Sequence, residues 1–462
     1  MLPLLLAALP AEIDATASVS PTASAVYATT GTTHFAMALA AADASLWTRI
    51  RLPRTTFLFD MSGHYGQALF VTGTNNPPRD VSTHSRARAD IVSSPRTTLV
   101  FLSDGFVSSR IGLRASDELL VRDPFSANRV LDGWSAQSSL SIGLAPRASL
   151  RFDARYSQMG AVAADLPAAV GIDTHSLLLS ATASFQASRR LSVGPVARLG
   201  WTHFNHALLD VEMHRGTAEV TSFSALASAR YDLSGRTRAS VMAGVTLASA
   251  PPQVKDVAMI ASPVARFEVR TLGRRVGGTA AVSMGYEAVG PRIGFGMDYS
   301  GVVDAWAMPF RGGNRRGVLV HLVARTRWAS ALLALSTPTP GASTQSNTGK
   351  LETTAFALGT SISAPFRLGW SLTGGIDLEF VSMHIDPLPE RGDPPAAFRG
   401  LLTLGLTAAS STDRRRLLPR DPLMPQDDPR TAAPIRAVRR SASKATVEDQ
   451  DDDDDESEEN DD

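Results

Sequence analysis

Apolar and polar side chains alternate one by one along much of this chain. From Leu368 to Phe380 the even-numbered residues are almost all large and apolar, whereas the odd-numbered ones are small or polar. The segment from Leu150 to Tyr156 alternates in the same way. Because successive side chains of a β-strand point to opposite faces, strict alternation of this kind predicts strands with one apolar and one polar face.

The length of these segments favours a membrane-spanning structure. Segments of seven to 13 residues recur along the chain, and a strand that crosses a bilayer needs about 9–11 residues, whereas many soluble strands have about 5–6. No apolar run reaches the ~20 residues of a membrane-spanning helix. The pattern predicts an all-β protein, an antiparallel transmembrane β-barrel with its apolar face outward. A soluble or surface-exposed β-repeat protein is the alternative class.

A turn motif recurs between the alternating segments. A small or turn-forming residue precedes an arginine, as in Leu52-Pro53-Arg54-Thr55, Ser94-Pro95-Arg96-Thr97 and Ala145-Pro146-Arg147-Ala148. The eight anchor arginines are 39 to 51 residues apart, at positions 54, 96, 147, 190, 236, 275, 316 and 367. Proline and glycine at such sites are typical of hairpin turns.

Counting strands from these turns gives about 16–18. Eight hairpins account for 16 strands, and first and last strands near Thr16–Tyr27 and Phe398–Ala408 bring the total to 18. An even number is usual for bacterial single-chain barrels and places the first and last strands' chain termini on the same side of the membrane, expected to be the periplasmic side, with the short arginine turns. The sequence therefore predicts a bacterial outer-membrane location.

Three regions follow from this pattern. Residues 1–15 resemble an export signal with an apolar core, residues 16–410 form the predicted outer-membrane β-barrel, and residues 411–462 form a linker and acidic tail. Twelve of the 15 residues from Glu448 to Asp462 are Asp or Glu. This composition predicts disorder, and it lacks the fixed spacing of a calcium-binding loop.

Charge and composition exclude several classes of function. The formal net charge is zero and there is no cysteine, so disulfides and thiolate chemistry are absent. Basic residues are scattered singly, whereas a nucleic-acid-binding protein gathers them on one face. The nine histidines form no HExxH motif, and no GxSxG motif accompanies them. We therefore expect no enzyme activity, no cofactor, no metal site and no nucleic-acid partner.

The polar face of the predicted strands carries the only functional signal. Its charged residues are expected to point into the lumen of the barrel, where they either attract anions and hydroxyl-rich solutes or pair with one another across neighbouring strands. These lumen-facing candidates are Arg151, Asp153, Arg155, Arg198, Arg230, Arg238, Arg266, Glu268, Arg270, Arg325, Arg327, Asp377 and Glu379.

The turn Ser94-Pro95-Arg96-Thr97-Thr98-Leu99 and its copies at Leu52 and Ala145 resemble those of a known group. They are similar to the repeated hairpin turns of porin-like outer-membrane barrels of the exopolysaccharide and PEP-CTERM-associated type. This resemblance implies a conduit serving exopolysaccharide export. Its expected partners are outer-membrane lipid, polysaccharide or small polar solutes, and periplasmic export components. A structural or adhesive barrel with an occluded lumen is the alternative function.

Overall fold

The computed structural model describes most of the chain between Glu12 and Ser411. The predicted export signal up to residue 11 and the predicted tail beyond Ser411 lie outside the described residues. The described residues are 12–30, 33–72, 80–108, 129–163, 172–208, 215–249, 259–273, 275–290, 294–309, 317–334, 348–367, 369–386 and 396–411. None of them belongs to a helix that could cross a membrane.

Eighteen strands make up the structure. The first nine are β1 (Glu12–Thr30), β2 (Thr33–Arg51), β3 (Thr55–Thr72), β4 (Asp80–Ser94), β5 (Thr97–Ser108), β6 (Arg129–Ala145), β7 (Ala148–Ala163), β8 (Ile172–Gln186) and β9 (Leu191–Leu208). The others are β10 (Arg215–Asp232), β11 (Thr237–Ser249), β12 (Met259–Leu272), β13 (Val276–Gly290), β14 (Gly294–Ala307), β15 (Leu319–Ala334), β16 (Thr348–Arg367), β17 (Trp370–Asp386) and β18 (Ala397–Ser411).

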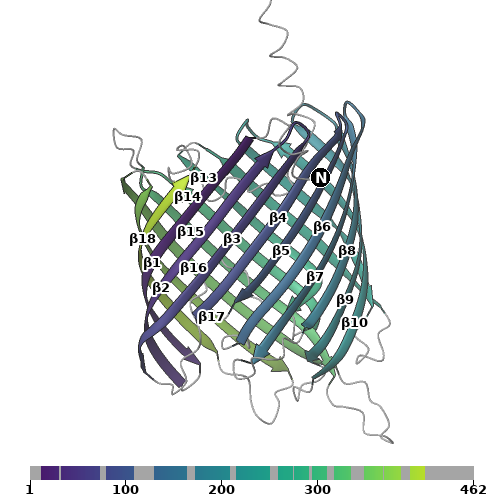
Figure 1. Ribbon diagram of the computed structural model, residues 1–462. Coiled ribbons are helices and arrows are strands. Elements are labelled where there is room, and N and C mark those ends of the chain that lie inside the picture. Colours follow the sequence, from purple (N-terminus) through teal and green to yellow (C-terminus); the bar gives the residue numbers. More distant parts are fainter. Residues whose placement is uncertain are drawn as a thin grey trace, which may run out of the picture.

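The strands form one closed antiparallel barrel (Figure 1). Each strand pairs with its neighbours in sequence, and β1 closes the ring by pairing with β18 from Thr16 opposite Ser411 to Thr30 opposite Ala397. The predicted all-β barrel is confirmed, and its 18 strands match the upper end of the expected range. Closure leaves no free edge along the β1–β18 seam, which a barrel in lipid requires because the bilayer core offers no hydrogen-bonding partner.

The two faces of the wall differ as the alternation predicts. In β7, Phe152 is 44% exposed on the outer face, while its neighbours Arg151 and Asp153 lie on the opposite face and bind each other. Large exposed apolar side chains recur on the outer face of other strands, as at Leu199, Phe267 and Phe380. An apolar exterior and a polar interior are the features of a barrel that stands in lipid and encloses water.

The described arginine turns lie together at one end of the barrel, the upper end in Figure 1, and the predicted turn at Arg316 lies outside the described residues. The backbone carbonyl of an anchor arginine accepts a hydrogen bond from a residue near the end of the second strand that follows it, as in Val92 N of β4 to Arg54 O at 2.8 Å. The same bond occurs at Arg96, Arg147, Arg190, Arg236 and Arg275. In the last hairpin Gly369 O accepts the corresponding hydrogen bond, from Ala409 N at 2.7 Å. Gly369 has a φ of 79°, a conformation that favours glycine.

Strands in the structure are longer than the sequence pattern suggests. They run from 12 residues in β5 to 20 in β16, well beyond the about 9–11 residues that a bilayer requires. β9, for example, has 18 residues and continues to Leu208, and β10 begins at Arg215. The first strand begins at Glu12, so the expected boundary after residue 15 falls inside β1.

One hairpin leaves the wall and folds inward. The β12–β13 ladder runs only from Leu272 to Ala265, although β12 stays paired with β11 back to Met259. Beyond this point Tyr286 of β13, which alternation places on the outer face with Val282, is only 7% exposed. It packs against Phe204 and Val220, which belong to the inner face of β9 and β10.

Met297, which is opposite Tyr286 in β14, confirms this displacement. It packs against the same inner-face cluster, and Ser262 Oγ of β12 lies 2.8 Å from its Sδ. β14 also approaches β9, although four strands separate them in the ring. The loop end of the β13–β14 hairpin therefore lies against the inner surface of β9–β12 and narrows the lumen.

Single cysteines placed in this cysteine-free chain test the inward hairpin. A lipid-soluble maleimide should label Tyr299→Cys, whose parent side chain is 40% exposed on the outer face, and should spare Met297→Cys two residues away. A short thiol cross-linker should join Met297→Cys to Ser262→Cys. Equal labelling of Met297→Cys and Tyr299→Cys from the lipid phase would show that the hairpin stays in the wall.

Candidate functional site: the inner wall of the barrel

The charged residues singled out from the sequence share one face of their strands. This face is opposite to the one that carries the exposed apolar side chains. For example, Arg198 is next in sequence to the exposed Leu199, and Arg230 is next to the exposed Tyr231. The structure places on this inner face Arg151, Asp153, Arg155, Arg198, Arg230, Arg238, Arg266, Glu268, Arg270, Arg325, Arg327, Asp377 and Glu379. They are spread around β7 to β17, so they line the wall of a lumen and do not converge on one point.

Several of these residues neutralise one another. Arg151 Nη2 lies 2.8 Å from Asp153 Oδ1, and both side chains also bind Ser139 of β6. Arg266 Nη2 lies 2.8 Å from Glu268 Oε2. Arg238 Nε lies 3.0 Å from Asp232 Oδ1, which also has Arg230 Nε at 3.9 Å. In this part of the wall the inner charges therefore pair with one another.

Other ion pairs join neighbouring strands. Arg327 Nε of β15 lies 2.6 Å from Asp298 Oδ1 of β14, at the base of the inward hairpin. Arg399 of β18 binds Glu379 of β17. Both pairs are largely shielded from solvent, with side-chain exposures of 11% and 6% for the first pair and 14% and 13% for the second. They tie adjacent strands together on the inner side of the barrel.

A further polar cluster lies on the inner face of β4 and β5. Asp104 accepts a hydrogen bond from Arg86 Nη2 at 2.8 Å, and His84 Nε2 lies 2.9 Å from its carboxylate. Next to it, Arg88 binds Asp90 at 2.8 Å. Sequence reasoning missed these residues, although Arg86 and Arg88 alternate with Ala87 and Ala89. The alternation over Ser85–Asp90 was the signal that could have identified them.

Hydroxyl groups occupy much of the inner wall between the charges. Ser18 Oγ lies 2.7 Å from Ser45 Oγ, and Ser20 Oγ lies 2.8 Å from Thr407 Oγ1. Similar pairs join Ser224 to Thr246 and Ser283 to Ser300, each at 2.7 Å. These pairs present rows of donors and acceptors to whatever fills the lumen.

Apolar side chains cover the inner wall toward the loop end. Val26, Met37, Leu39 and Leu401 form one buried cluster. In β16 and β17, Leu351 is 1% exposed, Ile385 is 0% exposed, and Met383 and Val381 are also buried. Together with the Phe204 cluster, they make this half of the lumen less polar than the half near the turns.

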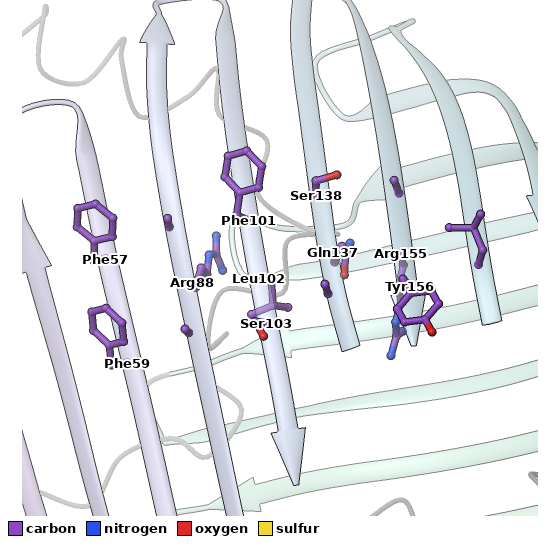
Figure 2. Close-up of a pocket in the computed structure, with 15 residues that line it drawn as sticks. Phe57, Phe59, Arg88, Phe101, Leu102, Ser103, Gln137, Ser138, Arg155 and Tyr156 are labelled. Carbon is purple, nitrogen blue, oxygen red and sulfur yellow. The ribbon is translucent and has the colours of Figure 1, made fainter. Parts of the chain in front are cut away.

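A separate groove of about 490 Å³ lies on the other side of the wall (Figure 2). Its rings, Phe57, Phe59, Phe101 and Tyr156, come from β3, β5 and β7, and Phe59 and Phe101 are 43% and 47% exposed on the outer face. Small side chains such as Ala87, Ala136 and Ala154 lie between the rings. Arg88, Gln137 and Arg155 also contribute to its lining. Because the rings and the small side chains between them belong to the lipid-facing set, we assign the groove to the outer side of the wall.

The structure offers no metal centre within its described part. There, no three His, Asp or Glu side chains gather closely enough to hold an ion. Charged groups such as Arg151, Arg238 and Arg327 have carboxylates as partners, and Arg198 Nη2 lies 3.2 Å from Met242 Sδ.

Removing one member of the hairpin-base ion pair should destabilise the barrel. Asp298→Asn leaves the Arg327 guanidinium in a shielded position without its carboxylate, which costs about 3–5 kcal/mol in comparable buried pairs. Glu268→Gln at the more exposed Arg266–Glu268 pair should cost less than about 1 kcal/mol. Urea unfolding of the refolded barrel in micelles measures both, and equal midpoints would contradict the assigned role of Asp298.

Comparison with known proteins gives only distant likenesses. No family model matches the chain, and no curated protein matches its sequence. Among solved structures it is similar to the siderophore receptor PirA from Acinetobacter baumannii, with 7% identity, a TM-score of 0.39, and 85% of this chain and 80% of that one covered. It is similar to OpdQ from Pseudomonas aeruginosa, with 9% identity, a TM-score of 0.37, and 87% and 98% covered. It is also similar to OccAB2 from Acinetobacter baumannii, with 12% identity, a TM-score of 0.38, and 86% and 98% covered.

The assignment to a membrane comes from the structure itself. A closed barrel of 18 antiparallel strands with an apolar exterior and a polar interior is the architecture of bacterial outer-membrane proteins. The chain is an outer-membrane β-barrel.

Proposed function

We propose that this protein is a porin-like channel that lets small polar solutes cross the outer membrane. The observation that carries the proposal is the polar inner face of a closed 18-stranded ring. Barrels of about 16–18 strands leave an aqueous channel unless segments of the chain plug them. Here the β13–β14 hairpin narrows the channel from one side.

Pairing of the inner charges sets the expected selectivity. Because Arg151, Arg238, Arg327 and Arg399 have carboxylate partners, the lumen offers anions less excess positive charge than the number of arginines suggests. The paired hydroxyls of the wall suit uncharged, hydroxyl-rich solutes, which exchange hydrogen bonds with serine and threonine. We therefore infer weak ion selectivity and passage of neutral polar solutes.

Exopolysaccharide is the more specific cargo that we propose. Support comes from the repeated turn around Pro95-Arg96 and from the hydroxyl-lined wall. A polysaccharide conduit would also need periplasmic export components at the turn end of the barrel. A vesicle-swelling assay with oligosaccharides of increasing length tests this cargo separately from ion conductance.

An occluded barrel with a structural or adhesive role is the second candidate. Burial of apolar side chains on the inner wall favours it, because Phe204 and Ile385 are both 0% exposed although they face inward. The β13–β14 hairpin covers Phe204, and an occluded lumen would exclude water from Ile385. Conductance separates a narrowed channel from a closed one.

Planar-bilayer recordings of the refolded full chain are the decisive test. We expect steady conductance steps with weak ion selectivity in a salt gradient. Arg151→Gln should shift the reversal potential toward cation preference, because it leaves the Asp153 carboxylate in the lumen without its cationic partner.

Phe152→Leu is the matched control, since Phe152 lies between these two residues and points outward. It should leave both the conductance and the reversal potential unchanged. A barrel that inserts and resists heat but passes no ions would refute the channel and favour the occluded alternative.

A further inference from the structure

Arginines surround the turn end of the barrel. Eight of them belong to the turns or their flanking residues and are exposed: Arg54, Arg96, Arg147, Arg189, Arg190, Arg236, Arg275 and Arg367. We call this set the rim arginines. The described turn residues 52–54, 95–96, 146–147, 187–190 and 233–236 contain no acidic side chain.

The rim arginines differ from the arginines of the inner wall in their partners. Inner-wall residues such as Arg151 and Arg327 have carboxylates within ion-pair distance. In the described part of the chain, no carboxylate forms an ion pair with any rim arginine. Their structural contribution comes from the backbone, since the anchor positions form hydrogen bonds through the carbonyl oxygen and, at Arg96, Arg190 and Arg236, through the amide N–H as well. The guanidinium groups are therefore available to bind a ligand.

We propose that the rim arginines bind the acidic end of this same chain, residues 448–462. This segment contains 12 carboxylates and no basic residue. The remaining 447 residues contain all 45 basic residues and 33 of the 45 acidic ones, an excess of 12 positive charges that matches the tail. The protein would thus carry its own polyanionic ligand for its periplasmic rim.

The topology puts the rim arginines and the residue from which the tail continues at the same end of the barrel. β18 ends at Ser411 opposite Thr16 of β1, on the side of the arginine turns. The 36 residues from 412 to 447 separate this point from Glu448. A flexible chain of that length has a root-mean-square span of about 30–36 Å, comparable to the barrel diameter of roughly 35 Å expected from strand spacing and tilt. The tail can reach every turn.

Many weak contacts on one tether can act together. A single exposed ion pair contributes little, but a covalently attached polyanion is present at an effective concentration in the millimolar range. Two other partners compete for these charges. The linker contains its own cluster, Arg414-Arg415-Arg416, and the phosphates of surrounding lipid can approach the rim.

A spin label on the tail of the full-length protein distinguishes these partners. Ser457→Cys places a nitroxide between Glu456 and Glu458. In a phosphate-free neutral detergent at low salt we expect a slow component in the electron paramagnetic resonance spectrum. It should fall severalfold at about 0.5 M salt, where screening shortens the range of the attraction to a few ångströms.

The rim variant combines Arg54→Gln, Arg96→Gln, Arg147→Gln, Arg190→Gln, Arg236→Gln and Arg275→Gln. It should lose the slow component and keep the heat resistance of the barrel, because the anchor carbonyl bonds are made by the backbone. The linker variant, Arg414→Gln with Arg415→Gln and Arg416→Gln, is the matched control and should retain the slow component.

Three results would overturn the proposal. The first is a slow component that survives in the rim variant and vanishes in the linker variant, which would place the tail on its own linker. The second is a label that moves freely in every protein. The third is a slow component that anionic lipid nanodiscs abolish, which would assign the rim to lipid phosphate. Conductance does not enter this test, so its outcome is independent of whether the barrel is an open channel.

Discussion

Closure of the backbone hydrogen-bond ring is the constraint on which the rest of this structure depends. A strand in lipid cannot leave its N–H and C=O groups unpaired, so the 18 strands can exist there only because β18 returns to β1. Closure fixes an inside and an outside, and the period of two then assigns each side chain to lipid or lumen. The ion pairs, hydroxyl rows and outer aromatic groove all follow from that assignment.

Repetition made this constraint visible in the sequence. The alternation over Leu150–Tyr156 and Leu368–Phe380 predicted strands, and the recurring arginine turns predicted their number. These signals are local: a hairpin needs only a turn residue and two alternating flanks. Ring closure itself is not local, but an even count of long strands leaves few other ways to satisfy every backbone group.

Departures from the prediction occur where contacts are made across the lumen. Tyr286 and Met297 have the parity of outward residues, and nothing in their own strands shows that they pack inside against Phe204. One hint was local: Pro263 lies in the part of β12 that has no β13 partner, and proline is tolerated at unpaired strand edges. Charge pairing also depended on the register, since Asp298 and Arg327 meet only because β14 and β15 align as they do.

The distribution of charge gives the arginines of this chain two different roles. On the inner wall, low solvent access makes an uncompensated charge costly, so arginine and carboxylate occur within ion-pair distance and stabilise strand pairing. At the rim, water solvates a guanidinium at little cost, and a positive side chain can remain without a partner in the barrel. On the inner wall the ion pairs cancel much of the positive charge of the arginines, whereas the rim arginines have no carboxylate partner in the described part of the chain. Their positive charge offsets part of the negative charge of the acidic end, and the formal net charge of the chain is zero. The negative charge of the acidic end equals the excess positive charge of the barrel and linker. Within the described barrel, the rim is where these opposite charges can be in direct contact.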